Sequence, residues 1–100
     1  MVTLLDPDGP FKLRVSKGAR KDLWLESLEV WQREAPVVRV TNWEWMFRNR
    51  SEYRFAPNFT DNEQFAYRYS SRRVIEIHQA ILSELHIEVE VVARRALVSL

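Results

Sequence analysis

The chain of 100 residues contains no cysteine, which excludes disulfides and thiolate chemistry and allows a reducing compartment. No apolar run approaches the roughly 18 residues that a membrane helix needs, and the N-terminus lacks the apolar core of a signal peptide. We therefore expect a protein that works inside the cell, in the cytoplasm or within a virion, without a membrane partner.

Glycine and lysine are also scarce. The two glycines, Gly9 and Gly18, are too few for a loop that cradles phosphate. Every cation after Lys21 is an arginine, which stacks on rings and forks onto carboxylate or phosphate. Because the net charge is only +1, attraction to an acidic partner would have to come from a local patch.

The remaining composition is that of an ordinary globular protein. Apolar residues make up 46% of the chain and charged residues 29%, which argues against disorder. A chain of this length forms one domain and can bury one modest core. We therefore expect a single domain over residues 1–100.

Aromatic side chains are concentrated between residues 43 and 69, with arginines threaded among them. Arginine, tyrosine and tryptophan are enriched at the centres of protein interfaces. We select as candidate partner-binding residues Arg48, Arg50, Arg54, Tyr67, Arg68, Arg72 and Arg73.

The first third of the chain predicts a strand and then a helix. Residues 11–15 alternate apolar and polar side chains, which is typical of a half-buried strand with its odd positions inward. In residues 19–35, Trp24, Leu28, Trp31 and Ala35 fall on one helical stripe. Pro36 would end this helix.

The middle of the chain allows two interpretations. A strand over residues 37–47 would need a bulge near Thr41 and Asn42, because its apolar side chains switch from even to odd positions. The alternative is a short helix capped by Asn42, whose apolar stripe fails within two turns. We favour the strand, followed by a hairpin turn at 48–51 and a second strand that ends at 56–58.

The last part predicts a helix and a final strand. Thr60 and Glu63 have the spacing of a capping box, so a helix is expected from 61 to about 84, weakest at Ser70 and Ser71. Residues 86–91 alternate again, and an apolar tail over 92–100 could add an edge strand to a partner.

The resulting order, βαββαβ, predicts an α+β fold of the ferredoxin-like (split βαβ) type, with two helices on one face of a mainly antiparallel sheet. The strand at 11–15 would lie beside the one at 87–91, with Lys12 and Arg14 opposite Glu88 and Glu90. The expected core is Phe11, Leu13, Val15, Trp24, Leu28, Trp31, Trp43, Trp45, Phe47, Ile77, Ile81, Ile87, Val89 and Val91.

No residues are arranged for catalysis in a recognisable motif. There is no G-x-S-x-G elbow, and His78 shares no helix face with Glu76 as metal ligands would require. We therefore expect His78 and His86 to be partly exposed near a helix end, with no catalytic residue, cofactor or metal. One alternative is a small metal-independent nuclease that uses Tyr67, Arg72, Arg73, Glu76 and His78.

The preferred function depends on which side of the middle strands faces the core. Burying Glu44 and Arg48 unpaired would cost several kcal/mol, so the rings should point inward and the arginines outward. Because Glu44 and Glu52 lie among those arginines, a protein partner fits better than phosphate. We expect a non-enzymatic interaction or assembly subunit of a homo-oligomer or a larger complex, such as a viral or phage particle.

The alternative is an RNA- or DNA-binding protein that uses the arginine face. Rings exposed to water, or a helix in place of the middle strand, would remove the argument for a protein surface and favour nucleic acid.

Overall fold

The computed structural model describes residues 2–3, 9–94 and 98–99, and it shows an α+β fold with an antiparallel sheet of 5 strands and 2 helices. The sheet contains β2 (Phe11–Val15), β3 (Trp24–Gln32), β4 (Ala35–Pro36), β5 (Arg54–Thr60) and β6 (Val89–Ala93). The helices are α1 (Trp43–Arg48) and α2 (Arg72–Glu84), with 3-10 turns η1 (Arg50–Glu52) and η2 (Glu63–Phe65). A separate ladder pairs β1 (Val2–Thr3) with β7 (Val98–Ser99).

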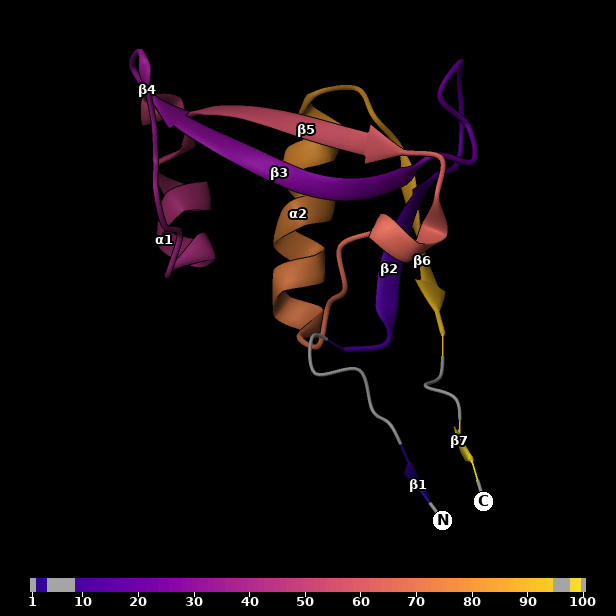
Figure 1. Cartoon of the computed structure of the whole chain (residues 1–100). Coiled ribbons are helices and arrows are strands. Elements are labelled where there is room, and N and C mark those ends of the chain that lie inside the picture. Colours follow the sequence, from indigo (N-terminus) through magenta and orange to yellow (C-terminus); the bar gives the residue numbers. More distant parts are fainter. Residues whose placement is uncertain (1, 4–8, 95–97, 100) are drawn as a thin grey trace.

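The strands run in the order β4-β3-β2-β6, and β5 pairs with β3 along almost its whole length. The β3–β5 ribbon crosses over the β2–β6 pair at a steep angle, and α2 lies between α1 and that pair (Figure 1). None of the described helices is long and apolar enough to span a membrane. The core is formed by Leu13, Leu25, Tyr69, Ile75 and Leu82, contributed by β2, β3, α2 and the segment before α2.

The predicted neighbourhood of the first and last strands is confirmed. β2 pairs antiparallel with β6, and Arg14 lies opposite Glu90 with an ion pair of 2.6 Å. Glu88 is held by Lys17 at 3.5 Å instead of by a strand residue. These exposed ion pairs contribute little free energy, so the apolar odd positions of β2 must supply most of the stability of this pairing.

Lys12 does not face Glu88 as predicted, because the register of β2 and β6 places it opposite Val92. The Lys12 ammonium lies 3.3 Å from Glu63, which also accepts two hydrogen bonds from Arg94. The guanidinium of Arg94 lies over the ring of Trp24. Both faces of β2 are therefore covered. Leu13 and Val15 are buried on one face, and Lys12 is buried on the other.

The prediction of a helix over residues 19–35 is wrong, because this segment contains β3. A bulge between Leu25 and Ser27 leaves Glu26 without a partner in β5. After the bulge, Leu28 and Val30 return to the face that carries Leu25. One inserted residue converts a spacing of two into a spacing of three and so breaks the alternation by which a strand is recognised. The predicted helical stripe is not one face of the strand, because Trp24 and Trp31 lie on the opposite side of β3 from Leu28.

The predicted strand over 37–47 is also wrong, and the alternative helix is confirmed. Asn42 caps α1 by accepting a hydrogen bond from the Trp45 amide at 2.9 Å. The helix buries only Met46 and ends at Arg48, where the apolar stripe runs out. Val38, which was placed in a strand, is 98% exposed.

The long helix predicted over 61–84 is divided into two elements. The first element is the short turn η2. Its N-cap is Asn62 and not the predicted Thr60, because the Asn62 side chain accepts a hydrogen bond from the Gln64 amide. The α-helix begins only at Arg72, with Ser71 as its cap, so the predicted weak point is where the helix starts. Pro57 does not end β5, because among the described strands β5 pairs with β3 alone and the missing N–H faces outward.

The segment between η2 and α2 closes a gap in the sheet, where β2 and β3 separate. The Tyr67 amide donates to Leu25 at 2.8 Å, and Tyr69 exchanges two backbone hydrogen bonds with Phe11. These bonds hold the segment extended and prevent it from joining α2.

The ferredoxin-like arrangement is not confirmed, because the segment expected to form its first helix is a strand. Parts of the expected core are correct: Leu13, Val15, Trp24, Ile77 and Ile81 are buried. Two other members are not, since Trp45 is 45% and Val91 is 40% exposed. Of the predicted tail, residues 92–93 belong to β6 and 98–99 to β7, and residues 95–97 and 100 lie outside the described part.

Gly9 should be intolerant of substitution, and Gly18 provides the matched control. Both have positive φ, 101° and 90°, but a β-carbon on Gly9 would also collide with the Tyr69 carbonyl, whereas Gly18 has open space around it. We expect Gly18→Ala to lower the free energy of unfolding by about 1–2 kcal/mol, and Gly9→Ala by about 1–3 kcal/mol more. Urea denaturation measures both, and equal losses would contradict the close approach.

Candidate functional site

The seven predicted partner-binding residues do not form one surface. Arg48, Arg50 and Arg54 meet around one groove, whereas Tyr67 and Arg68 line a second depression. The last two lie at the start of α2. There, Arg72 extends over the ring of Phe11 and Arg73 is ion-paired with Glu44.

The first groove lies where the end of α1, the turn η1, the start of β5 and the end of α2 meet. Its volume is about 670 Å³. We call it the arginine groove, and it is lined by Arg48, Arg50, Ser51, Tyr53, Arg54, Phe55, Glu84 and Leu85.

Arg50 is a structural member of the groove. Its guanidinium lies 2.7 Å from Glu84 and donates to the Phe47 carbonyl at 3.0 Å, and it also covers the Phe47 ring. These contacts tie η1 to the end of α2. Arg50 therefore shapes the groove, and its charge is already neutralised by a neighbour.

Arg48 and Arg54 are the groove cations that form no ion pair with a described carboxylate. The Arg54 guanidinium lies 5.1 Å from the centroid of the Trp31 ring, its cross-strand neighbour in β3. Arg48 lies near enough to Glu44 to help lower the pKa of that carboxyl, after the larger effect of the Arg73 hydrogen bond. Two exposed positive charges thus remain beside the groove.

Exposed apolar side chains adjoin these charges. Leu85, in the groove wall, is 39% exposed. Trp45 packs edge-on against Tyr53, with ring centroids 6.2 Å apart. The groove therefore combines cationic and apolar contact surface, the composition enriched at the centres of protein interfaces.

A buried cluster fixes α1 against α2 and so holds one wall of the groove. The edge-on rings of Trp43 and His78 have centroids 4.2 Å apart, and His78 is only 1% exposed. Its Nδ1 is hydrogen-bonded to the hydroxyl of Tyr69, also buried. Burial lowers the pKa of His78 to about 4, and burial chiefly raises the pKa of Tyr69.

The expectation that His78 is partly exposed is therefore wrong. The helical stripe of α2 places it on the inner face between Ile75 and Leu82, where it is buried by Trp43 and Tyr69. Its Nε2 has no hydrogen-bond partner among the described residues. The neutral imidazole acts here as part of the core.

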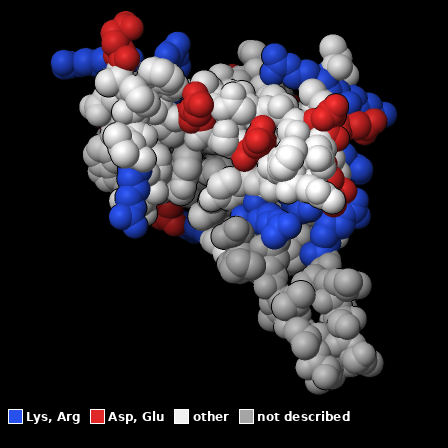
Figure 2. Space-filling model, viewed as in Figure 1, with Lys and Arg blue, Asp and Glu red and all other residues white. Residues whose placement is uncertain are grey.

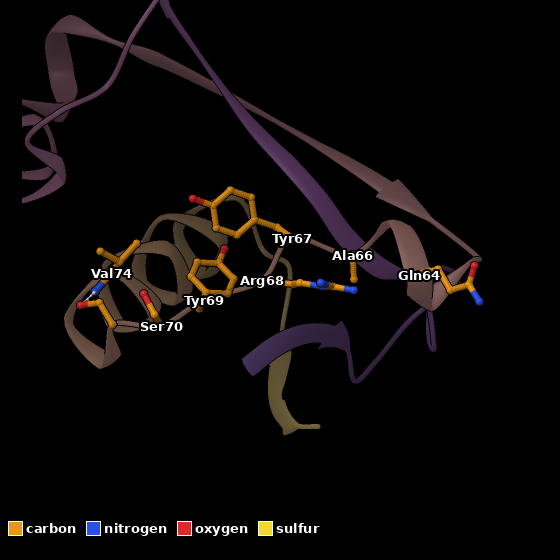
Figure 3. A pocket seen from close by; sticks show the side chains of 8 residues that line it. Gln64, Ala66, Tyr67, Arg68, Tyr69, Ser70 and Val74 are labelled. Carbon is orange, nitrogen blue, oxygen red and sulfur yellow. Dashed lines mark hydrogen bonds between the residues drawn. The ribbon is translucent and has the colours of Figure 1, made fainter. Parts of the chain in front are cut away.

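The second depression lies beside the start of α2 and has a volume of about 520 Å³. The rings of Tyr67 and Tyr69 lie close together below β3, and Gln64 marks the far end near η2 (Figure 3). The Val74 amide donates to the Ser71 hydroxyl at its margin. Of the seven predicted partner-binding residues, Tyr67 and Arg68 line this depression, and neither lines the arginine groove.

The residues considered for nuclease chemistry do not converge on one accessible point. His78 is buried, Arg73 is bound to Glu44, and Arg72 lies over Phe11. Within the described part of the chain, no group of three or more His, Asp or Glu side chains could hold a metal ion. In the described part of the chain, His78, Arg72 and Arg73 are therefore each engaged in other contacts.

Because residues 43–48 form α1 and not a strand, the expected alternation of inward rings and outward arginines does not apply to them. Trp45, Phe65 and Tyr67 are exposed. Trp45 belongs to α1, which lies on the opposite side of the molecule in Figure 1 from η2, the turn that contains Phe65. Acidic and basic side chains are interspersed over the face seen in Figure 2. Among the described residues, the exposed ring of Trp45 is therefore separated from that of Phe65, whereas a platform for single-stranded nucleic acid places its rings along one groove.

Three comparisons, with protein-family models, with curated proteins and with solved structures, find no match to this chain.

The stability of the fold should fall as the pH is lowered from 7 to 5. Because the folded pKa of His78, about 4, lies below the usual 6.5, the unfolded chain takes up the proton first. The stabilisation is complete above about pH 6.5 and is lost toward pH 4. We expect a loss of about 2 kcal/mol between pH 7 and 5 by urea denaturation.

The matched variants separate titration from packing. His78→Phe should be nearly insensitive to pH in this range, whatever its absolute stability. Tyr69→Phe keeps the buried imidazole and should retain the slope. The lowered pKa values of Glu44 and Glu63 act only below their ordinary value of 4.5. An unchanged slope in His78→Phe would contradict the assignment.

Proposed function

We propose that this chain is a non-enzymatic interaction subunit that docks a segment of another protein in the arginine groove, within a larger assembly. The observation that supports it most directly is the union of three predicted arginines with Tyr53, Phe55 and Leu85 in one groove. Two of those arginines, Arg48 and Arg54, form no ion pair with a described carboxylate.

The chemistry of the groove specifies its occupant. A carboxylate side chain would form a charge-assisted, bidentate hydrogen bond with a guanidinium such as that of Arg54. Leucine-like side chains would cover the exposed edge of Leu85 and the rings of Trp45 and Tyr53. The expected partner therefore presents acidic and apolar side chains close together.

The alternative, binding of RNA or DNA, shares the cations but not their surroundings. Arg50 is paired with Glu84, so Arg48 and Arg54 are the groove cations that form no ion pair with a described carboxylate, fewer than the several phosphate contacts on which a nucleic-acid backbone relies. Counterion release would also give nucleic-acid binding a steep salt dependence. The two functions can be distinguished by one titration experiment.

The experiment uses isotope-labelled protein titrated with a short peptide of alternating Glu and Leu, followed by NMR. We expect shift changes centred on Arg48, Tyr53, Arg54 and Leu85, because the groove places two cations without an ion pair beside the exposed Leu85. Arg48→Glu with Arg54→Glu should weaken binding at least tenfold, which is about 1.4 kcal/mol.

Two controls make the result specific. Arg20→Glu with Lys21→Glu makes the same change in net charge in an exposed turn away from the groove and should leave binding unchanged. A peptide with Lys in place of each Glu should not bind. Peptide-induced shifts outside the groove would overturn the proposal. Tighter binding of a single-stranded oligonucleotide, with steep salt dependence, would overturn it in favour of nucleic acid.

A further inference from the structure

Strand β6 lies at the edge of the sheet, and among the described residues only β2 pairs with it. On the β2 side, the Arg94 amide donates to Pro10 and the Glu88 carbonyl accepts from Ser16. In an antiparallel ladder these roles alternate, so the even positions of β6 face β2. The N–H and C=O groups of Val89, Val91 and Ala93 therefore point outward from the sheet.

The opposite edge of the sheet is protected in a way that β6 is not. Of the strands that the structure describes, β3 alone pairs with β5, and the outer edge of β5 contains Pro57, which supplies no donor. β6 has no proline. It also exposes Val91, which is 40% accessible although it lies opposite the fully buried Leu13. An open row of backbone groups beside an exposed valine is a pairing surface.

We infer that β6 pairs antiparallel with β6 of a second copy of this chain, about a two-fold axis at Val91. In this register Val91 faces the partner's Val91, and Val89 faces the partner's Ala93. Only outward-pointing residues face one another, so each facing pair can exchange two backbone hydrogen bonds. The sheets of the two copies would then become continuous.

The side chains agree with this register. On the apolar face, the two Val91 side chains become direct neighbours and bury the surface that is exposed in one copy. On the polar face, Glu88 lies opposite the partner's Arg94, and the symmetric pair repeats this contact. Glu90 lies opposite the partner's Val92, so no like charges face each other directly.

The charges already present in one copy are compatible with pairing. Arg94 uses Nε and Nη2 for Glu63, and its other donors remain for Glu88 of the partner. Glu90 is neutralised by Arg14, which reduces its diagonal repulsion with the partner's Glu90. A short edge buries much less area than a standard interface, so the dimer should form only at high protein concentration.

Cysteine cross-linking tests the register directly, because the natural chain has no cysteine. A facing pair of this kind has Cα atoms about 5.5 Å apart, within reach of a disulfide. Under mild oxidation Val91→Cys should give a covalent dimer. A mixture of Val89→Cys and Ala93→Cys chains should form mainly the mixed disulfide, while Ser83→Cys, exposed on α2, sets the background rate.

Analytical ultracentrifugation over a concentration series tests the pairing without a cross-link. Val91→Pro removes an N–H that points away from β2, so circular dichroism should show the native fold. Its dimer dissociation constant should rise at least tenfold. If this variant does not fold, Val91→Lys places two like charges opposite each other and serves the same purpose.

A wild-type chain that stays monomeric at every concentration would overturn the inference. Dimers that persist in Val91→Lys, or cross-linking at Val91 no faster than at Ser83, would also overturn it. None of these substitutions lies in the arginine groove. Failure of the dimer and failure of peptide docking are therefore distinguishable.

Discussion

The position of Tyr69 is the constraint on which the rest of this structure depends. Its backbone bonds to Phe11 at the edge of β2, and its ring lies in the core between the sheet and α2. Its hydroxyl holds His78, and His78 packs against Trp43 of α1. One residue thus connects the sheet, the long helix α2 and the short helix α1. The Tyr69 carbonyl also approaches Gly9 so closely that a β-carbon at that position would collide with it.

The elements that were predictable are those whose side-chain pattern reflects one local geometry. β2 and β6 alternate regularly, so their existence and their adjacency through Arg14 and Glu90 could be derived from the sequence. α1 could be proposed from the cap at Asn42 but not chosen, because its six residues bury only Met46 and leave almost no periodic signal.

The elements that were missed are governed by contacts distant in sequence. The bulge at Glu26 is stabilised by pairing with β5, more than 25 residues later, and without that partner the pattern of β3 resembles a helix. Likewise, the Tyr67 amide bonds to Leu25, which holds the chain extended where local propensity allows helix. Tertiary pairing overrides local preference at both places.

In the candidate site, too, some residues could be predicted from the local sequence and others could not. Arg48, Arg50 and Arg54 could be selected by residue type, and the structure brings them together. Their neighbours Glu84 and Leu85 could not be found, because they come from the far end of α2. Arg72 and Arg73 are separated from the groove because they begin α2, whereas Glu84 and Leu85 lie at its other end.

The positions of the two surfaces bear on how such a subunit could work. The groove lies at the α1 side of α2, whereas β6 lies on the opposite side of the molecule (Figure 1). Two copies joined at β6 would therefore carry their grooves at the outer ends, both open to partners. Two linked weak sites bind a partner with repeated segments far more tightly than one site alone. A small groove and a short strand edge, each weak by itself, would then suffice for a stable assembly.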